Sequence, residues 1–118
     1  MKILVTGGAG FVGTNLIKEL ENSEYQIQNI DKSISKIFPE LTTIADIRDK
    51  NGLTATFNSS IDILILLAAE HKDNVSPLSL YYDVNVQGTK NILKVMVLGV
   101  LLQILIQHTL HLQDQLQD

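Results

Sequence analysis

The chain has 118 residues, of which 45% are hydrophobic, and its nine lysines and arginines against thirteen aspartates and glutamates give a formal net charge of −4. This length fits one domain of the usual roughly 100–200 residues, and the scattered positive charge provides no basic stripe for nucleic acid. The chain contains no cysteine, which excludes thiol catalysis, disulfides and thiolate metal sites and agrees with an expected cytoplasmic location.

Two apolar segments bear on membrane targeting. The N-terminal apolar run stops at Thr6 and is followed by glycines, so it lacks the apolar region of about 7–15 residues that a signal peptide needs. Residues 95–102 form the longest apolar stretch, which is shorter than the roughly 20 residues of a membrane-spanning helix. We therefore expect no membrane partner.

Short apolar runs alternate with longer helical patterns from the first residues onward. Residues 2–6 predict a buried strand, and residues 11–21 repeat apolar side chains at the spacing of a helix. Residues 25–30 alternate in polarity and end at Asp31, which indicates a second strand. A weaker third strand is expected over residues 41–45.

The following segments continue this alternation. Asp49 is expected to cap a helix that extends through Phe57. Residues 61–67 are nearly all apolar, as is typical of a central parallel strand covered on both faces. From Pro77 a helical pattern runs for about twenty residues, and we expect Gly88 to interrupt it.

The C-terminal part completes the pattern. Gly99 is expected to end the last helix, and residues 100–106 are expected to form a fifth strand. Residues 107–118 are rich in glutamine and histidine and predict a polar tail after a domain of residues 1–106. Strands that alternate with helices imply right-handed crossovers and a parallel α/β sheet with helices on both faces, which is the doubly wound class.

A glycine-rich loop joins the first predicted strand to the first predicted helix. Residues 6–13 read TGGAGFVG and fit the GxGxxG pattern. In such a loop, glycines allow the tight turn, the approach of a pyrophosphate and close helix packing, while the helix N-terminus offers free N–H groups. The alternative, that the glycines only form a turn capped by Asp31, is disfavoured because glycines cost conformational entropy that a plain turn would not require.

Asp31 lies 18 residues after Gly13, at the end of the second strand, where a carboxylate accepts hydrogen bonds from both ribose hydroxyls of a dinucleotide. A carboxylate also repels a 2′-phosphate, and we find no arginine near it in the sequence to offset this charge. The expected cofactor is therefore NAD rather than NADP.

Further motifs extend the pattern beyond the glycine loop. In chain order, the motifs are residues 6–13, Asp31, residues 45–49 (ADIRD), residues 67–69 (LAA) and residues 82–89 (YDVNVQGT). With them the chain resembles the extended short-chain dehydrogenase/reductase family, specifically the NAD-dependent nucleotide-sugar epimerases and dehydratases, up to about residue 97. Together with the order of elements, the resemblance implies the N-terminal part of a Rossmann-type fold, a truncated doubly wound sheet of about five strands in the order 3-2-1-4-5.

The resemblance also implies how the cofactor is held. Gly7, Gly10 and Gly13, with the backbone of Phe11 and Val12, would hold the pyrophosphate. Asp31 would bind the adenosine ribose, and Asp46 with Ile47 would flank the adenine edge. The path to the nicotinamide half would be lined by Leu67, Ala68 and Ala69, and Asn85 would brace the loop after the fourth strand and the cofactor from the following helix. As alternatives, Asp46 could be only a cap near a helix, and the two alanines only small residues that permit close packing.

The catalytic pair of this family is absent from the sequence. In the family, the tyrosine of a Tyr-x-x-x-Lys motif takes the proton of a sugar hydroxyl while NAD takes the hydride. None of Tyr25, Tyr81 and Tyr82 has a lysine four residues later, and the sequence departs from the family's residue choices after about Val97. We therefore expect a truncated or frame-disrupted NAD-binding part that is inactive alone, without catalytic residues or a metal site. A nucleotide-sugar would bind only if a C-terminal part were supplied.

A different class of function is kept as an alternative. The chain could be a non-catalytic interaction module or a homo-oligomer that retains the cofactor loop by descent, with the apolar residues 95–106 covered by a partner or a second copy. A reductase acting on a small carbonyl would share the same N-terminal motifs.

Overall fold

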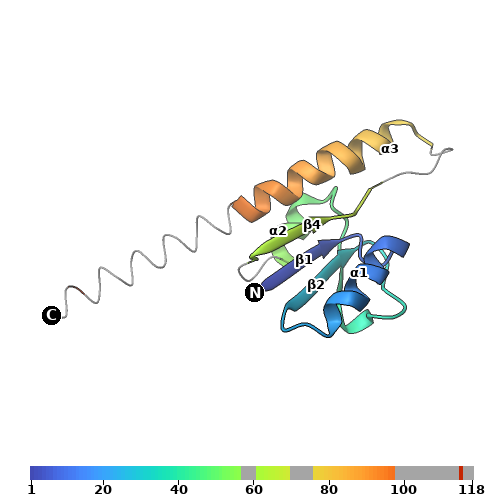
Figure 1. Cartoon of the computed structure of the whole chain (residues 1–118). Coiled ribbons are helices and arrows are strands. Elements are labelled where there is room, and N and C mark those ends of the chain that lie inside the picture. Colours follow the sequence, from blue (N-terminus) through green and yellow to red (C-terminus); the bar gives the residue numbers. More distant parts are fainter. Residues whose placement is uncertain (57–60, 70–75, 98–114, 116–118) are drawn as a thin grey trace.

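The computed structural model describes residues 1–56, 61–69, 76–97 and 115. Within these residues, four strands form one parallel sheet in the order β3-β2-β1-β4 (Figure 1). The strands are β1 (Lys2–Thr6), β2 (Gln26–Asp31), β3 (Thr42–Ile44) and β4 (Ile63–Leu66). The predicted parallel sheet and the order of its first four strands are thus confirmed. The fifth strand predicted at residues 100–106 lies outside the described residues, as does the predicted tail apart from Gln115.

Strand β1 lies between β2 and β4, so both of its edges are hydrogen-bonded. Its last residue, Thr6, is opposite Ile30 of β2 and Leu66 of β4. Because all four strands are parallel, their carboxyl ends meet at one edge of the sheet. The segments that leave the strands at this edge are therefore brought together, although they are distant in the sequence.

Helices cover both faces of the sheet (Figure 1). Helix α1 (Phe11–Glu21) lies on one face. On the other face lie α2 (Lys50–Thr56) and a long helix formed by α3 (Ser79–Tyr82), the π-helical η2 (Asp83–Gly88) and residues 89–97. We refer to the long helix as the 79–97 helix. None of the helices in the described part is both long and apolar enough to cross a membrane.

The core is divided by the sheet into two apolar clusters. On the α1 face, the buried residues are Ile3, Val5, Ile17 and Phe38. On the opposite face, they are Leu4, Ile30, Ile47, Leu53, Ile92 and Val95. Successive residues of β1 point to opposite faces, as strand geometry requires, and both faces are apolar because helices cover both.

Three local predictions differ from the structure. The fourth strand spans Ile63–Leu66 rather than residues 61–67. The third strand is shorter than expected, because Pro39–Leu41 forms the short 3-10 helix η1 immediately before it. The predicted interruption at Gly88 is wrong, since the helix changes from π to α form there and continues through residues 89–97. A Cβ at Gly88 would lie 2.6 Å from Ile47 Cδ1, so close packing, not a helix break, requires this glycine.

The predicted cap of α2 is confirmed. Asp49 lies directly before the helix, and its Oδ1 accepts a hydrogen bond from Gly52 N at 3.1 Å. This bond satisfies one of the amide groups that have no partner inside the first turn of a helix. The end predicted at Phe57 lies outside the described residues.

Candidate functional site

A cleft of about 290 Å³ lies at the carboxyl edge of the sheet. Each strand contributes its end or the segment that follows it: the glycine loop after β1, residues 30–33 at the end of β2, residues 45–48 after β3 and residues 67–69 after β4. Val84 of η2 completes the lining of the described part. In doubly wound sheets, ligands bind at this edge, where the strand order reverses beside the first strand.

Gly7 makes the turn that takes the chain out of β1. Its φ is +77°, a conformation that favours glycine, and its N–H donates to Ile30 O at 2.9 Å. A Cβ at this position would lie 2.6 Å from Ala68 N. Gly7, which follows β1, therefore lies within a few ångströms of both β2 and the segment after β4, at the base of the cleft.

The other loop glycines have different surroundings. A Cβ at Gly13 would lie 2.4 Å from the Gly8 Cα, and a Cβ at Gly8 would lie 2.4 Å from Asn29 Oδ1. Packing within the chain accounts for both glycines. At Gly10, by contrast, a Cβ would meet only Gly7 O, at 3.5 Å, and Gly10 lines the cleft. The absence of a side chain at Gly10 leaves space on the cleft side of the loop.

Helix α1 begins at this loop with Gly10 as its N-cap. No side chain caps it, no acidic residue lies in its first turn, and Thr14 N donates to Gly10 O at 2.9 Å. The N–H groups of the first turn and the helix dipole make such a helix end attractive to anions. The side chains of Phe11 and Val12 are exposed, and neither these residues nor Gly13 belong to the cleft lining.

The carboxylate of Asp31 faces the glycine loop. Its Oδ2 accepts from Ala9 N at 3.0 Å, and its Oδ1 accepts from Ser33 N at 2.9 Å. Both bonds come from backbone amides, which fix the side chain at the end of β2. Asp31 and Gly10, both predicted to hold the cofactor, thus lie in one lining.

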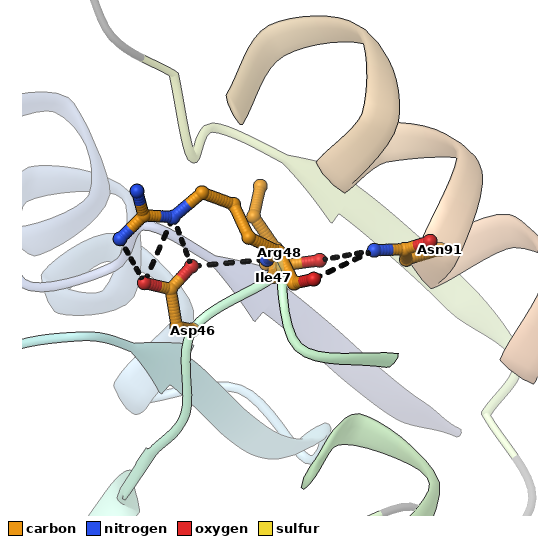
Figure 2. A network of polar contacts seen from close by, with 4 residues as sticks. All are labelled: Asp46, Ile47, Arg48 and Asn91. Carbon is orange, nitrogen blue, oxygen red and sulfur yellow. Dashed lines mark hydrogen bonds and ion pairs between the residues drawn. The ribbon is translucent and has the colours of Figure 1, made fainter. Parts of the chain in front are cut away.

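The segment after β3 carries an ion pair on the cleft (Figure 2). Arg48 Nε donates to both carboxylate oxygens of Asp46 at 3.0 Å, and Arg48 N donates to Oδ1 at 2.9 Å. The Arg48 hydrogen bonds hold the pKa of Asp46 below its usual value, and Asp46 raises the pKa of Arg48. Asp49, rather than Asp46, is the helix cap of this segment.

The expectation that no arginine lies near Asp31 is wrong. Arg48 is distant from Asp31 in the sequence but lines the same cleft, as does Lys32. The ends of β2 and β3 are neighbours in the sheet, so residues that follow β3 lie beside Asp31. The Arg48 guanidinium is paired with Asp46, so its charge is already partly compensated.

Two buried asparagines, Asn29 and Asn91, form hydrogen bonds to segments that line the cleft. Sequence analysis predicted neither of them. Asn29 is 0% exposed, and its Oδ1 accepts from Gly8 N at 2.8 Å while its Nδ2 donates to Thr42 Oγ1 at 3.0 Å. Asn91 is 4% exposed, and its Nδ2 donates to Ile47 O at 3.0 Å and to Arg48 O at 3.2 Å. The available signal was an amide side chain at a position where the strand or helix pattern requires burial.

The remaining predicted residues divide between the cleft and the surface. Leu67, Ala68 and Ala69 line the cleft, and Leu67 N donates to Thr6 O at 2.9 Å. Asn85 lies on η2 and is exposed, and it is not part of the lining, which its neighbour Val84 joins instead.

Comparison with known proteins identifies relatives of the chain. A family model described as the NAD dependent epimerase/dehydratase family matches residues 3–104. The chain is 50% identical over 94 residues to N-acetyl-alpha-D-glucosaminyl-diphospho-ditrans,octacis-undecaprenol 4-epimerase of Escherichia coli O157:H7. That alignment covers 80% of this chain and 28% of the relative.

Two solved structures share the fold. UDP-glucose 4-epimerase from Bifidobacterium longum, solved with NAD+ and UDP, matches with a TM-score of 0.72 and 28% identity, covering 84% of this chain and 34% of that one. UDP-glucose 4-epimerase from Thermus thermophilus, solved with NAD, matches with a TM-score of 0.66 and 28% identity, covering 80% and 33%. The chain thus spans about a third or less of the length of these relatives.

Proposed function

The chain belongs to the NAD-dependent epimerase/dehydratase family, and from this premise we propose that it binds NAD in the cleft at the carboxyl edge of the sheet. The observation that carries the proposal is the surroundings of Gly10. Packing within the described chain does not require glycine there; Gly10 is the N-cap of α1, which no side chain caps, and it shares the cleft lining with the Asp31 carboxylate. Space, free amides and a carboxylate in this arrangement suit the pyrophosphate and ribose of a dinucleotide.

The glycine loop and α1 would hold the pyrophosphate. Gly7 and Gly10 border the cleft, and the backbone amides of Phe11, Val12 and Gly13 belong to the first turn of α1. Their side chains are not needed for this contact, which agrees with their absence from the lining. Amide donors in a fixed geometry bind an anion without the entropy cost of ordering long side chains.

The segments on either side of the loop would hold the two nucleosides. The Asp31 carboxylate would accept hydrogen bonds from the adenosine ribose, in part in place of its present bond to Ala9 N. Asp46 and Ile47 would border the adenine, because they lie beyond Asp31 on the β3 side of the cleft. Leu67, Ala68 and Ala69, on the β4 side, would border the nicotinamide half.

For the whole enzyme we propose chemistry on a sugar joined to a diphosphate. The names of the relatives include both a lipid diphosphate sugar and UDP-glucose, which share this linkage. Bound NAD would supply hydride acceptance from a sugar carbon. The 118 residues contain no Tyr-x-x-x-Lys pair, so we propose that they contribute cofactor binding and do not turn over substrate by themselves.

Calorimetric titration of the 118-residue chain with NAD tests the proposal, with NADP titrated in parallel. We expect saturable binding of NAD and weaker binding of NADP, because the Asp31 carboxylate repels a 2′-phosphate. Asp31→Ala should weaken NAD binding by roughly 10–100-fold, the cost of losing hydrogen bonds to a charged group.

Asp62→Ala is the matched control. Asp62 lies just before β4, at the opposite edge of the sheet, where its Oδ2 accepts from Lys2 N. We expect its removal to leave NAD affinity unchanged. A folded chain that shows no saturable NAD binding would overturn the proposed function and favour the interaction module.

A further inference from the structure

We propose that Arg48 and Asn91 are positioning residues that preset the turn of residues 46–49 so that the cleft selects a 6-aminopurine base. The inference rests on the proposed function, because it assumes that the adenine of NAD lies against Asp46 and Ile47. It concerns two residues to which neither the sequence motifs nor the family resemblance gives a role.

Arg48 fixes the carboxylate from within the turn. Arg48 Nε donates to both Asp46 oxygens, and Arg48 N donates to Asp46 Oδ1. The backbone closes the same turn, because Asp49 N donates to Asp46 O at 2.9 Å. The Asp46 side chain therefore has its direction set before any ligand arrives, and the same pairing lowers its pKa and keeps it ionised.

Asn91 fixes the backbone of the turn from the other side. Figure 2 shows the Asn91 amide on one side of the turn and the Asp46 carboxylate on the other. The Asn91 Nδ2 donates to two successive carbonyls, Ile47 O and Arg48 O, and Gln87 Nε2 donates to Asn91 Oδ1 at 3.1 Å. With both of its polar atoms engaged and its side chain buried, Asn91 leaves the turn little freedom to rotate.

The packing of Ile47 adds a third constraint. Its side chain is buried against Gly88, where a Cβ would lie 2.6 Å from Ile47 Cδ1. Gly88 and Asn91 both belong to the 79–97 helix, so one helix holds the side chain and the carbonyl of Ile47 together. The Ile47 backbone and the Asp46 carboxylate then present a fixed edge to the cleft that both line.

This edge distinguishes purines by their hydrogen-bond pattern. An ionised carboxylate only accepts hydrogen bonds, so it pairs with the 6-amino group of adenine. Hypoxanthine carries a 6-oxo group, which is itself an acceptor, and would place two acceptors against each other. A site with fixed polar groups rejects such an analogue more strongly than a mobile one, because the groups cannot turn away.

The test compares NAD with nicotinamide hypoxanthine dinucleotide, which differ at the purine. Both affinities are measured by calorimetry for the 118-residue chain and for the Arg48→Met and Asn91→Leu variants. We expect the wild-type chain to prefer NAD by at least about tenfold, and each variant to lose most of this preference. Arg48→Lys, which keeps the charge but loses the Nε donor, should retain part of it.

Controls separate positioning from folding. Lys94→Met removes an exposed charge from the 79–97 helix away from the cleft, and we expect it to keep the wild-type preference. Asn91 is buried, so Asn91→Leu could lower stability; the Arg48 side chain is 43% exposed, and Arg48→Met should unfold at nearly the wild-type temperature. The Arg48→Met variant therefore decides the question if Asn91→Leu fails to fold.

The outcomes distinguish the two proposals. If the variants bind NAD and keep the wild-type preference, or lose affinity equally for both dinucleotides, the positioning role is overturned and the proposed function stands. A loss of preference in Arg48→Met with an unchanged preference in folded Asn91→Leu also overturns the joint role. Failure of the wild-type chain to bind NAD overturns the proposed function and this inference with it.

Discussion

The loop glycines differ in the atoms that an added methyl group would contact. Gly10 and Gly13 therefore form a matched pair for substitution by alanine. Gly13→Ala would place a Cβ 2.4 Å from the Gly8 Cα, a backbone atom that cannot move without distorting the loop. Gly10→Ala would meet only Gly7 O at 3.5 Å, with φ at −77°, which alanine adopts freely. The same substitution, three residues apart, should therefore act on different properties of the molecule.

We expect Gly13→Ala to lower stability by about 1–3 kcal/mol, a loss of several degrees in the unfolding temperature. Gly10→Ala should leave the unfolding temperature within about two degrees of wild type, because the methyl group meets no close atom. It should weaken NAD binding by roughly tenfold or more, because the methyl group occupies space beside the cleft. Thermal unfolding followed by circular dichroism and calorimetric titration measure the two effects. Equal loss of affinity without loss of stability in both variants would contradict this assignment.

At the scale of elements, Asn29 ties the glycine loop to two strands. Its side chain bonds the Gly8 amide in the loop and the Thr42 hydroxyl at the start of β3, and Thr42 Oγ1 donates in turn to Phe38 O. The loop is thus connected through β2 to β3 by a continuous chain of hydrogen bonds. Only one of these hydrogen bonds reaches the loop. Removing that bond and removing a bond farther along the series should therefore have different consequences.

Asn29→Leu removes the acceptor of the Gly8 amide and should cost about 1–3 kcal/mol, because a buried donor is left unpaired. We expect it to weaken NAD binding as well, since the loop loses a fixed point. Thr42→Val removes the hydrogen bonds of the Thr42 hydroxyl but keeps the bond between Gly8 N and Asn29. It should lower stability while leaving NAD affinity close to wild type. Chemical denaturation and calorimetry together check both parts. Equal losses of NAD affinity in the two variants would contradict this prediction and show that the series of hydrogen bonds acts as one unit.

The sequence predicted elements more accurately than it predicted contacts between them. The bounds of β1 and α1 followed from an apolar run that ends at a glycine loop, a local signal that the structure confirms. The role of Gly88 was misread, because its reason is a contact with Ile47 from another element. Arg48 was overlooked beside Asp31 for the same kind of reason, since the order β3-β2-β1 brings them together and no local pattern records that order.

The residues of the candidate site divide in the same way, into those with a local sequence signal and those without one. Gly7, Gly10 and Asp31 were predicted because the glycine spacing and the acidic strand end form a recognisable pattern. Asn29 and Asn91 were not predicted, because a buried amide becomes meaningful only when its partners are known. Their partners lie on other elements, so the hydrogen bonds follow from the assembled fold rather than from spacing.

At the scale of the whole molecule, the 79–97 helix and Leu78, the residue before it, present apolar side chains to solvent. The exposed residues are Leu78, Tyr82, Val86, Leu93 and Val97. Their spacing places them along one side of a helix, and such a stripe is typical of a surface that contacts another protein. The homo-oligomer was kept as an alternative, with the apolar residues 95–106 as its covered surface, and it remains a prediction. We assign its contact surface to this stripe instead.

We expect the chain to self-associate with rising concentration, and Leu93→Lys to shift it toward monomer, because a charge in the stripe would have to be desolvated on contact. Asn22→Lys, at the exposed end of α1, adds the same charge elsewhere and serves as control. Sedimentation velocity over a range of concentrations measures the change. A wild-type chain that stays monomeric throughout would contradict the prediction.

The central place of β1 also determines when the molecule can finish folding. Of the four strands, β1 is synthesised first, but its partner β4 pairs Ile3 with Ile63, so one edge of β1 stays open until the chain has been extended by some sixty residues. Pairing between such distant segments is slow, because the loop between them must be closed before any contact stabilises it. Residues Ile3–Thr6, among the most buried once the sheet is complete, therefore stay exposed on the ribosome for longer than the strands that follow them. During that interval this apolar strand needs protection from aggregation.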